Sequence, residues 1–241
     1  MKKLAVILLV AVAVAGGAAY WAYHSLDLIV RVAIEHYAPG IAGVSVKVGG
    51  VDISAADGRG VVRGLEIGNP AGFTAPRAMS VGEVRVVLDP ATVAGPVVRI
   101  RELSVESPLI TYERTDRGTN LQAIQKNIRR YIEQEGGSSE GRPAEAKHGR
   151  RKFVVDRIAL RGARVTMTNP GLRGQGITFN LPDIELREVG RRQGGLTASE
   201  IGGLVAAELE ARIAQRVLTN IELLKKGGAE GAIDALKGLL R

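Results

Sequence analysis

Apolar and polar residues alternate along the middle of the chain, roughly between Val44 and Leu186. A period of two is typical of strands that bury one face of a sheet. The apolar parity changes across Ser107-Pro108, where a proline would interrupt a central strand. The pattern therefore predicts strands on both sides of this dipeptide, joined by a tight turn or a β-bulge.

The strand pattern around Ser107-Pro108 recurs later in the chain. Gly162-Ala163 takes the place of Ser107-Pro108, and a shorter copy, VRGLEIGNP, begins at Val62. Copies of one strand–turn unit indicate a sheet that is built by repetition. When the later copy is aligned with the first in this way, the apolar residues of the two copies correspond. Ile100, Leu103, Val105, Ile110 and Tyr112 align with Val155, Ile158, Leu160, Val165 and Met167.

Three segments carry a helical period instead. In 24–40, apolar residues share one broad side and Asp27, Arg31 and Glu35 lie four apart on the other, and Pro39-Gly40 is expected to end the helix. This helix either caps the sheet or lies at a membrane surface. Capping boxes predict a second helix from Thr119, with Gln122, and a long third helix from Thr197, with Glu200. A short last helix is expected after Gly227-Gly228.

The N-terminus differs from the rest of the chain. Lys2 and Lys3 precede an uncharged apolar run from Leu4 to Ala22, which is long enough for a membrane-spanning helix with its N-terminus in the cytoplasm. Tyr20, Trp21 and Tyr23 are the expected membrane-interface residues. A cleaved signal peptide, cut after Ala13-Val14-Ala15, is the alternative.

These patterns together predict an α+β fold. We expect an N-terminal transmembrane helix, then a curved, mainly antiparallel, repeat-built sheet that forms a groove, with flanking amphipathic helices and a long C-terminal helix. The expected segments are an anchor (1–23), an amphipathic helix (24–40), a first β segment with its helix (41–133), a flexible linker (134–152), a second β segment (153–190) and C-terminal helices (196–241).

Composition narrows the range of functions. The 241 residues carry a net charge of +8, which indicates either an anionic partner, such as phospholipid, or a solvated basic surface. Aromatic residues make up 4%, too few for an aromatic-lined small-molecule pocket. We expect no nucleic-acid partner, because nearly the whole chain would lie on the far side of the membrane.

Catalytic and metal-binding motifs are absent from the sequence. There is no cysteine, and the histidines His24, His36 and His148 show no metal-ligand spacing. The chain also lacks a nucleophile elbow, a phosphate-binding loop and a dinucleotide-binding fingerprint. We therefore expect a protein that is not an enzyme, with no catalytic residues, no metal and no cofactor.

One long stretch, LDPATVAGPVVRIRELSVESPLITYERTDRGTNLQAI, resembles the AsmA-like family of envelope proteins. The matching features are Asp89-Pro90 after a strand, Pro108 between two strands, and Gly118-Thr119-Asn120-Leu121 at a helix start. The resemblance covers about residues 1–132 and weakens in the second copy, which lacks the proline and the Gly-x-Asn-Leu. It implies a periplasmic protein, held in the bacterial inner membrane by a single span, whose curved sheet handles phospholipid.

The leading hypothesis is thus a non-enzymatic protein of lipid transport or outer-membrane homeostasis, with an apolar groove for acyl chains. The alternative is a structural or assembly adaptor of the cell envelope that binds a partner protein through its C-terminal helix. This chain is too short to bridge a periplasm alone, so a conduit would need homo-oligomers or partners. Either lipid or the protein's own helices cover the apolar face, whose candidate residues are Val84, Val86, Leu103, Val105, Ile110, Tyr112, Ile158, Leu160, Val165, Met167 and Phe179.

Overall fold

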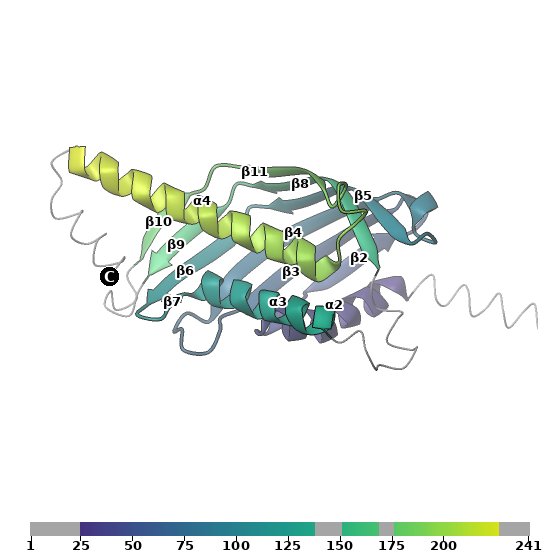
Figure 1. Cartoon of the computed structure of the whole chain (residues 1–241), viewed down its shortest axis with the longest axis horizontal. Coiled ribbons are helices and arrows are strands. Elements are labelled where there is room, and N and C mark those ends of the chain that lie inside the picture. Colours follow the sequence, from purple (N-terminus) through teal and green to yellow (C-terminus); the bar gives the residue numbers. More distant parts are fainter. Residues whose placement is uncertain (1–24, 138–150, 169–175, 227–241) are drawn as a thin grey trace, which may run out of the picture.

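The computed structural model describes residues 25–137, 151–168 and 176–226 (Figure 1). Three helices and one mixed sheet make up this part of the chain. The helices are α2 (Leu26–Ala42), α3 (Asn120–Gly137) and α4 (Ala198–Lys226), with a short 3₁₀ helix η1 (Pro90–Thr92). The strands are β1 (Val46–Lys47), β2 (Gly50–Ser54), β3 (Arg59–Gly68), β4 (Arg77–Leu88), β5 (Val97–Glu106), β6 (Leu109–Thr115), β7 (Gly118–Thr119), β8 (Lys152–Arg161), β9 (Arg164–Thr168), β10 (Ile177–Asn180) and β11 (Ile184–Val189).

Strands β5 and β6 follow one another along the same side of β4. Val105 of β5 lies opposite Val84, and Ile110 of β6 lies opposite Met79, so the antiparallel direction continues across Ser107-Pro108. Ser107 has a positive φ of 49°. The Ser107 N–H donates to Arg161 O at 2.8 Å, and the Arg164 N–H donates to Pro108 O at 2.9 Å. The register with β4 is the same on both sides of Ser107-Pro108, so the chain bends there without the predicted tight turn and without the extra residue of a β-bulge.

The two long copies of the repeat lie side by side. Strand β8 pairs in parallel with β5, Val97 opposite Lys152, and β9 pairs in parallel with β6 in the same register, Leu109 opposite Arg164. Gly162, which stands in the second copy where Ser107 stands in the first, also has a positive φ, of 61°. Both copies therefore bend at the same position, and their bends are in contact.

The expected fold class needs correction. The sheet is mixed rather than mainly antiparallel, because the two repeat copies pair in parallel. Parallel neighbours need a long crossover between them, and α3 with the residues after it provides this connection. No helix among residues 25–137, 151–168 and 176–226 is long and apolar enough to cross a membrane. The predicted span, with Tyr20, Trp21 and Tyr23, lies outside the described residues, as do most of the predicted linker and the last helix.

Helices α3 and α4 lie across one face of the sheet, and α2 lies beside α3, next to β1 and β2 (Figure 1). The main core is between this sheet face and the two covering helices. Ile110, Val165 and Met167 of the sheet are buried there with Leu121 of α3 and Ile213 of α4. A second, smaller cluster joins Val155 and Ile158 to Ile201 at the start of α4.

The structure confirms two predicted helix starts and contradicts one predicted helix end. The predicted capping boxes are confirmed: the Thr119 N–H donates to Gln122 Oε1 at 3.1 Å, and the Thr197 N–H donates to Glu200 Oε2 at 2.7 Å. The predicted end of α2 at Pro39-Gly40 is wrong. The helix contains Pro39 and ends at Gly43, whose left-handed φ of 68° lets its N–H donate to Pro39 O.

Candidate apolar binding site

Most of the groove residues predicted from the sequence lie in the closed core. Val105 and Phe179 pack against its margin, and Ile158 belongs to the second cluster. Val84 and Val86 are half-buried in β4, opposite Val105 and Leu103. The fully buried members are Ile110, Tyr112, Leu160, Val165 and Met167.

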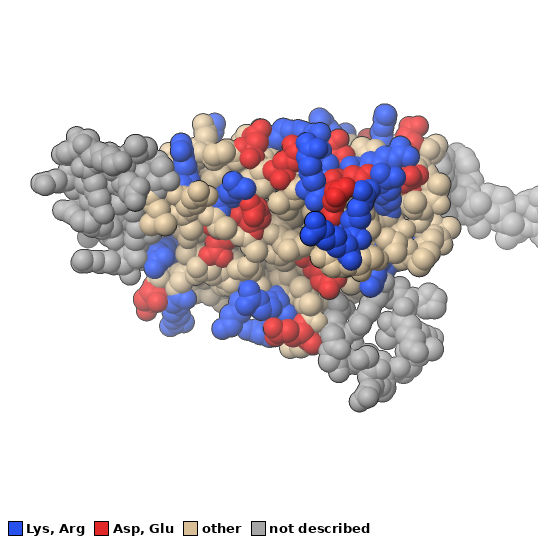
Figure 2. Space-filling view, turned by 45° about the horizontal axis from the view of Figure 1, so that its top comes forward, with Lys and Arg blue, Asp and Glu red and all other residues tan. Residues whose placement is uncertain are grey.

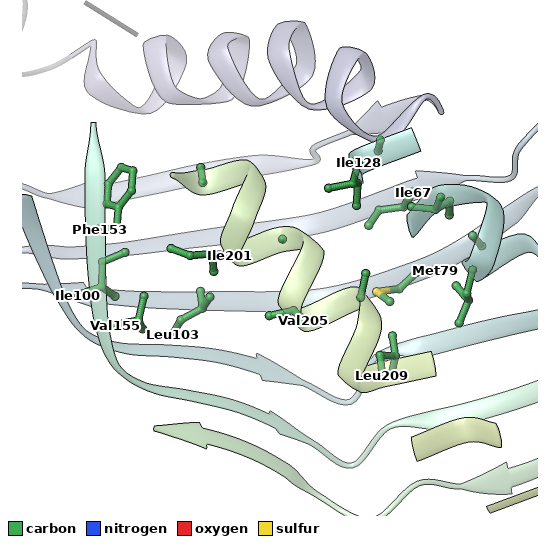
Figure 3. Close-up of a pocket in the computed structure, with 17 residues that line it drawn as sticks. Ile67, Met79, Ile100, Leu103, Ile128, Phe153, Val155, Ile201, Val205 and Leu209 are labelled. Atoms are coloured by element: carbon green, nitrogen blue, oxygen red, sulfur yellow. The ribbon is translucent and has the colours of Figure 1, made fainter. Parts of the chain in front are cut away.

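Of the predicted groove residues, Leu103 lines the apolar cavity that the described part of the chain encloses. This cavity has a volume of about 460 Å³ and lies between the sheet and helices α3 and α4 (Figure 3). All 17 of its wall residues are apolar. They are Ala42 of α2, Ile67, Ala78, Met79, Ile100, Leu103, Phe153 and Val155 of the sheet, Leu121, Ile124 and Ile128 of α3, and Ala198, Ile201, Gly202, Val205, Ala206 and Leu209 of α4.

Much of this apolar wall is not buried by the protein itself. Leu103, Phe153 and Val205 are only partly buried, and Gly202 is exposed. The cavity volume falls within the range of roughly 300–1,000 Å³ that is usual for small-ligand sites. It is therefore an open apolar space rather than a packing defect of the size of one side chain.

Small side chains on α4 explain why this space exists. Ala198, Gly202 and Ala206 lie four residues apart and line the cavity together. A Cβ added to Gly202 would meet no heavy atom within 4 Å. Residues four apart share one side of a helix, so the start of α4 presents its smallest side chains to the cavity.

The start of α4 is fixed to the sheet beside the cavity. The Phe153 N–H donates to Leu196 O at 2.7 Å, and the Leu196 N–H donates to Phe153 O at 2.9 Å. Gly190, with φ 81°, approaches the same strand so closely that an added Cβ would lie 2.9 Å from Phe153 O. These contacts hold the first turn of α4 over β8 without filling the space beneath it.

A buried polar network fixes the start of α3 on the other side. Glu113 is fully buried, and its carboxylate accepts from the Thr74 and Ala75 N–H groups at 2.7 and 2.8 Å and from Asn69 Nδ2 at 2.9 Å. Burial raises the pKa of Glu113, but these hydrogen bonds outweigh it, and the pKa is lowered from 4.5. Asn120 Oδ1 accepts from the Glu113 N–H at 3.0 Å. The Asn of the Gly-x-Asn-Leu motif is thus a structural residue.

A second carboxylate lies at the seam between α4 and α3. Burial raises the pKa of Glu210 from 4.5, and a hydrogen bond from Gln122 opposes this shift. Burial also raises the pKa of Tyr112, and the charge of Glu210 adds to that rise. Glu210 is therefore a partly desolvated acid between α3 and α4.

A second hollow adjoins the cavity. It has a volume of about 370 Å³, lies between α3 and α4, and shares Ile128 with the apolar cavity. Most of its lining is apolar, but Gln125 and Arg129 of α3 and Gln193 and Glu200 contribute polar side chains. An apolar cavity beside a hollow with some polar side chains matches the two ends of an amphiphile.

Another part of the sheet, formed by β5, β8 and β11, carries a ladder of ion pairs. Arg161 lies 2.9 Å from Glu106, and Arg99 lies 2.8 Å from Asp156. Figure 2 shows these basic and acidic side chains interleaved near the region of β5, β8 and β11. Such exposed pairs contribute only about 0–1 kcal/mol each, and they leave few unpaired charges in this part of the surface.

Among the described residues, no group of three His, Cys, Asp or Glu side chains could hold a metal ion.

Sequence patterns missed most of the cavity wall. Ile100 and Val155 were recognised as repeat positions but not as site residues, and no residue of the predicted long helix was named as a site residue. The signal that could have found the site is the spacing of Ala198, Gly202 and Ala206 within a helix otherwise rich in large apolar residues. No family model, no curated protein and no solved structure matches this chain.

Proposed function

We propose that this protein binds a lipid acyl chain in the apolar cavity and takes part in lipid handling in the cell envelope, as a non-enzymatic protein of AsmA-like type. The observation that carries this proposal is the lining: 17 residues, none with a polar side chain, around about 460 Å³.

The lining selects the class of ligand. A polar ligand would lose its hydrogen bonds to water on entering and find no side-chain partner, at a cost of roughly 2–7 kcal/mol for each unsatisfied group. An acyl chain instead gains about 0.8 kcal/mol for each CH₂ that leaves water. Several methylenes in contact with Leu103, Val155 and Val205 are therefore sufficient for stable binding.

The second hollow beside the cavity favours a lipid over a simple hydrocarbon. Arg129 supplies a cation and Gln125 an amide next to the shared residue Ile128, and Glu200 adds a carboxylate to the same hollow. A phosphate or carboxylate headgroup at Arg129 would keep its hydrogen bonds while the chain enters the apolar space.

The test is to fill the cavity from within. Gly202→Leu adds a side chain where a Cβ meets nothing, and it replaces a poor helix former with a good one. We expect the full-length wild-type protein to retain lipid in native mass spectrometry and Gly202→Leu to lose most of it. Ala211→Leu is the matched control, because it adds a leucine side chain at an exposed position of the same helix.

Two results would refute the proposal. One is a wild-type protein that never retains lipid, even when it is offered phospholipid during purification. The other is a folded Gly202→Leu variant that retains as much lipid as the wild type and Ala211→Leu do.

A second candidate is an adaptor that binds a partner protein through α4. Leu204 and Leu218 are exposed, by 48% and 61%, and their spacing of fourteen residues places them on nearly the same side of the helix. Because the chain has no cysteine, Leu218→Cys gives a single cross-linking site. A specific cross-linked partner in cells, lost in a Leu204→Asp, Leu218→Cys double variant, would favour the adaptor.

A further inference from the structure

Helix α2 turns its charged side toward the protein. Asp27 Oδ1 accepts from the Ile53 N–H at 2.8 Å, and Glu35 Oε1 accepts from the Val48 N–H at 2.9 Å. Arg31 lies 3.7 Å from Glu35 on the same side. The polar residues of α2 are therefore used to satisfy backbone donors of the sheet edge.

Part of the apolar surface of α2 faces outward. Leu28 is 62% exposed, Ile29 49%, Val32 55% and Tyr37 66%, and no residue of the helix is fully buried. Leu28, Ile29 and Val32 lie within about 100° of one another around the helix, and Tyr37 lies about 80° beyond Ile29. Other apolar residues of α2, such as Val30 and Ile34, are half-buried, so the helix carries more apolar side chains than the protein covers, and the outward stripe favours another apolar environment.

The surroundings of the stripe indicate what that environment is. The uncharged run from Leu4 to Ala22 ends four residues before α2 begins at Leu26. Helix α3, which lies beside α2, exposes Lys126 and Arg130. Apolar side chains with basic residues close by are the composition of surfaces that bind anionic bilayers.

A protein partner fits this stripe less well. Specific protein interfaces usually involve about 20–30 residues a side, whereas the stripe consists of a few side chains on one helix. A bilayer has no such requirement, because each apolar residue that enters the interface contributes separately.

We propose that the outward face of α2, formed by Leu28, Ile29, Val32 and Tyr37, seats on the surface of an anionic phospholipid bilayer. Ala42, at the end of the same helix, belongs to the cavity wall, so this contact brings the cavity close to its source of lipid. That the contact supplies the cavity with lipid rests on the proposed function, but the test of the contact itself does not.

Site-specific fluorescence tests the contact on the full chain. Since there is no native cysteine, Val32→Cys can carry a single environment-sensitive nitrobenzoxadiazole label. Arg187→Cys on β11, whose native side chain is 74% exposed, serves as the control site. Both proteins are reconstituted in vesicles of phosphatidylcholine and phosphatidylglycerol, with and without brominated acyl chains.

We expect the label at position 32 to emit at shorter wavelength and to be quenched several-fold more by brominated lipid than the label at position 187. Equal quenching at the two positions would overturn the proposal. A blue-shifted label at position 32 without quenching would also overturn it, because a protein surface would then cover the stripe. Adding Gly202→Leu should leave the quenching at position 32 unchanged, which separates a failure of this contact from a failure of the cavity.

Discussion

Helix α4 covers the sheet in two different ways along its length. Near its start, Ala198, Gly202 and Ala206 face an open apolar cavity. Farther along, Leu209, Ile213 and Val217, again four residues apart, are buried in the closed core. The same helix and the same spacing thus give a packed interior or an empty one, and the size of the side chains decides which.

The largest difference between the two regions should be seen in stability. Ile213 is fully buried, so Ile213→Ala should cost about 3–4 kcal/mol through lost transfer energy and a new void. Val205 is a partly buried residue of the cavity wall, and Val205→Ala should cost less than about 1 kcal/mol, since its neighbours already leave space. Urea unfolding followed by circular dichroism measures both. Equal losses would mean that the cavity is as tightly packed as the core.

The next largest effect on stability is expected in the buried polar network that fixes the start of α3. Glu113→Gln replaces one of the two carboxylate oxygens with an NH2 group, which would face the N–H group of either Thr74 or Ala75 as donor to donor. We expect a loss of about 2–3 kcal/mol in the free energy of unfolding at neutral pH. Thr74→Val, which removes one donor and leaves the carboxylate in place, is the control and should cost less.

Acid should reduce the difference between Glu113→Gln and the wild type. The folded-state pKa of Glu113 is lowered from 4.5, so its contribution is complete above that value and is lost as the pH falls through the lower folded-state pKa. The unfolding free energies of the two proteins should therefore converge as the pH falls from 4.5 through the lower folded-state pKa. A constant difference down to acid pH would show that the lost packing, rather than the charge, destabilises the variant.

The sequence predicted local features better than the way they combine. Capping boxes at Thr119 and Thr197 were found because each involves residues three apart. The repeat was also found, yet its parallel pairing was not, because alternation fixes which residues share a face and not which strand lies next to which. The cavity could not be predicted from the strands, because Leu103 in its wall and Ile110 in the closed core belong to the same kind of alternating pattern. The two regions differ in the helix residues that cover them.

The orientation of α2 illustrates the same limit. Its apolar and charged sides were both recognised, but periodicity does not indicate which side faces the protein. Asp27 and Glu35 face inward because the amides of Ile53 and Val48 need acceptors, and a requirement of this kind, between residues far apart in the chain, is visible only after folding.

Filling the cavity should have a smaller effect on stability, of the opposite sign. Gly202→Leu should raise the free energy of unfolding of lipid-free protein by about 1 kcal/mol, from helix propensity and new apolar contacts. Gly202→Ala, which adds the helix propensity without filling the space, separates the two contributions. In lipid-loaded protein the gain should vanish, because wild type then has the ligand's stabilisation and the variant does not. A loss of stability in the lipid-free protein would mean that there is no open space beneath residue 202.

The smallest effect on stability is expected at Glu210, at the interface between α3 and α4. Burial raises its folded-state pKa above 4.5, so the cost of burying its charge is absent in acid and sets in as the pH rises from that value through the folded-state pKa. Glu210→Gln removes this cost while keeping a polar group near Gln122, and it should stabilise the protein by about 0.5 kcal/mol at neutral pH. The gain should disappear in acid, so that the unfolding free energies of the wild type and Glu210→Gln converge. The wild type and Glu113→Gln are also expected to converge in acid, but here the variant is the more stable protein at neutral pH. Chemical denaturation of the wild type and Glu210→Gln across this pH range measures it, with the exposed Glu188→Gln as the control. A gain that persists in acid would assign the effect to packing at the seam, and the charge of Glu210 would then have no part in how tightly α4 closes over the sheet.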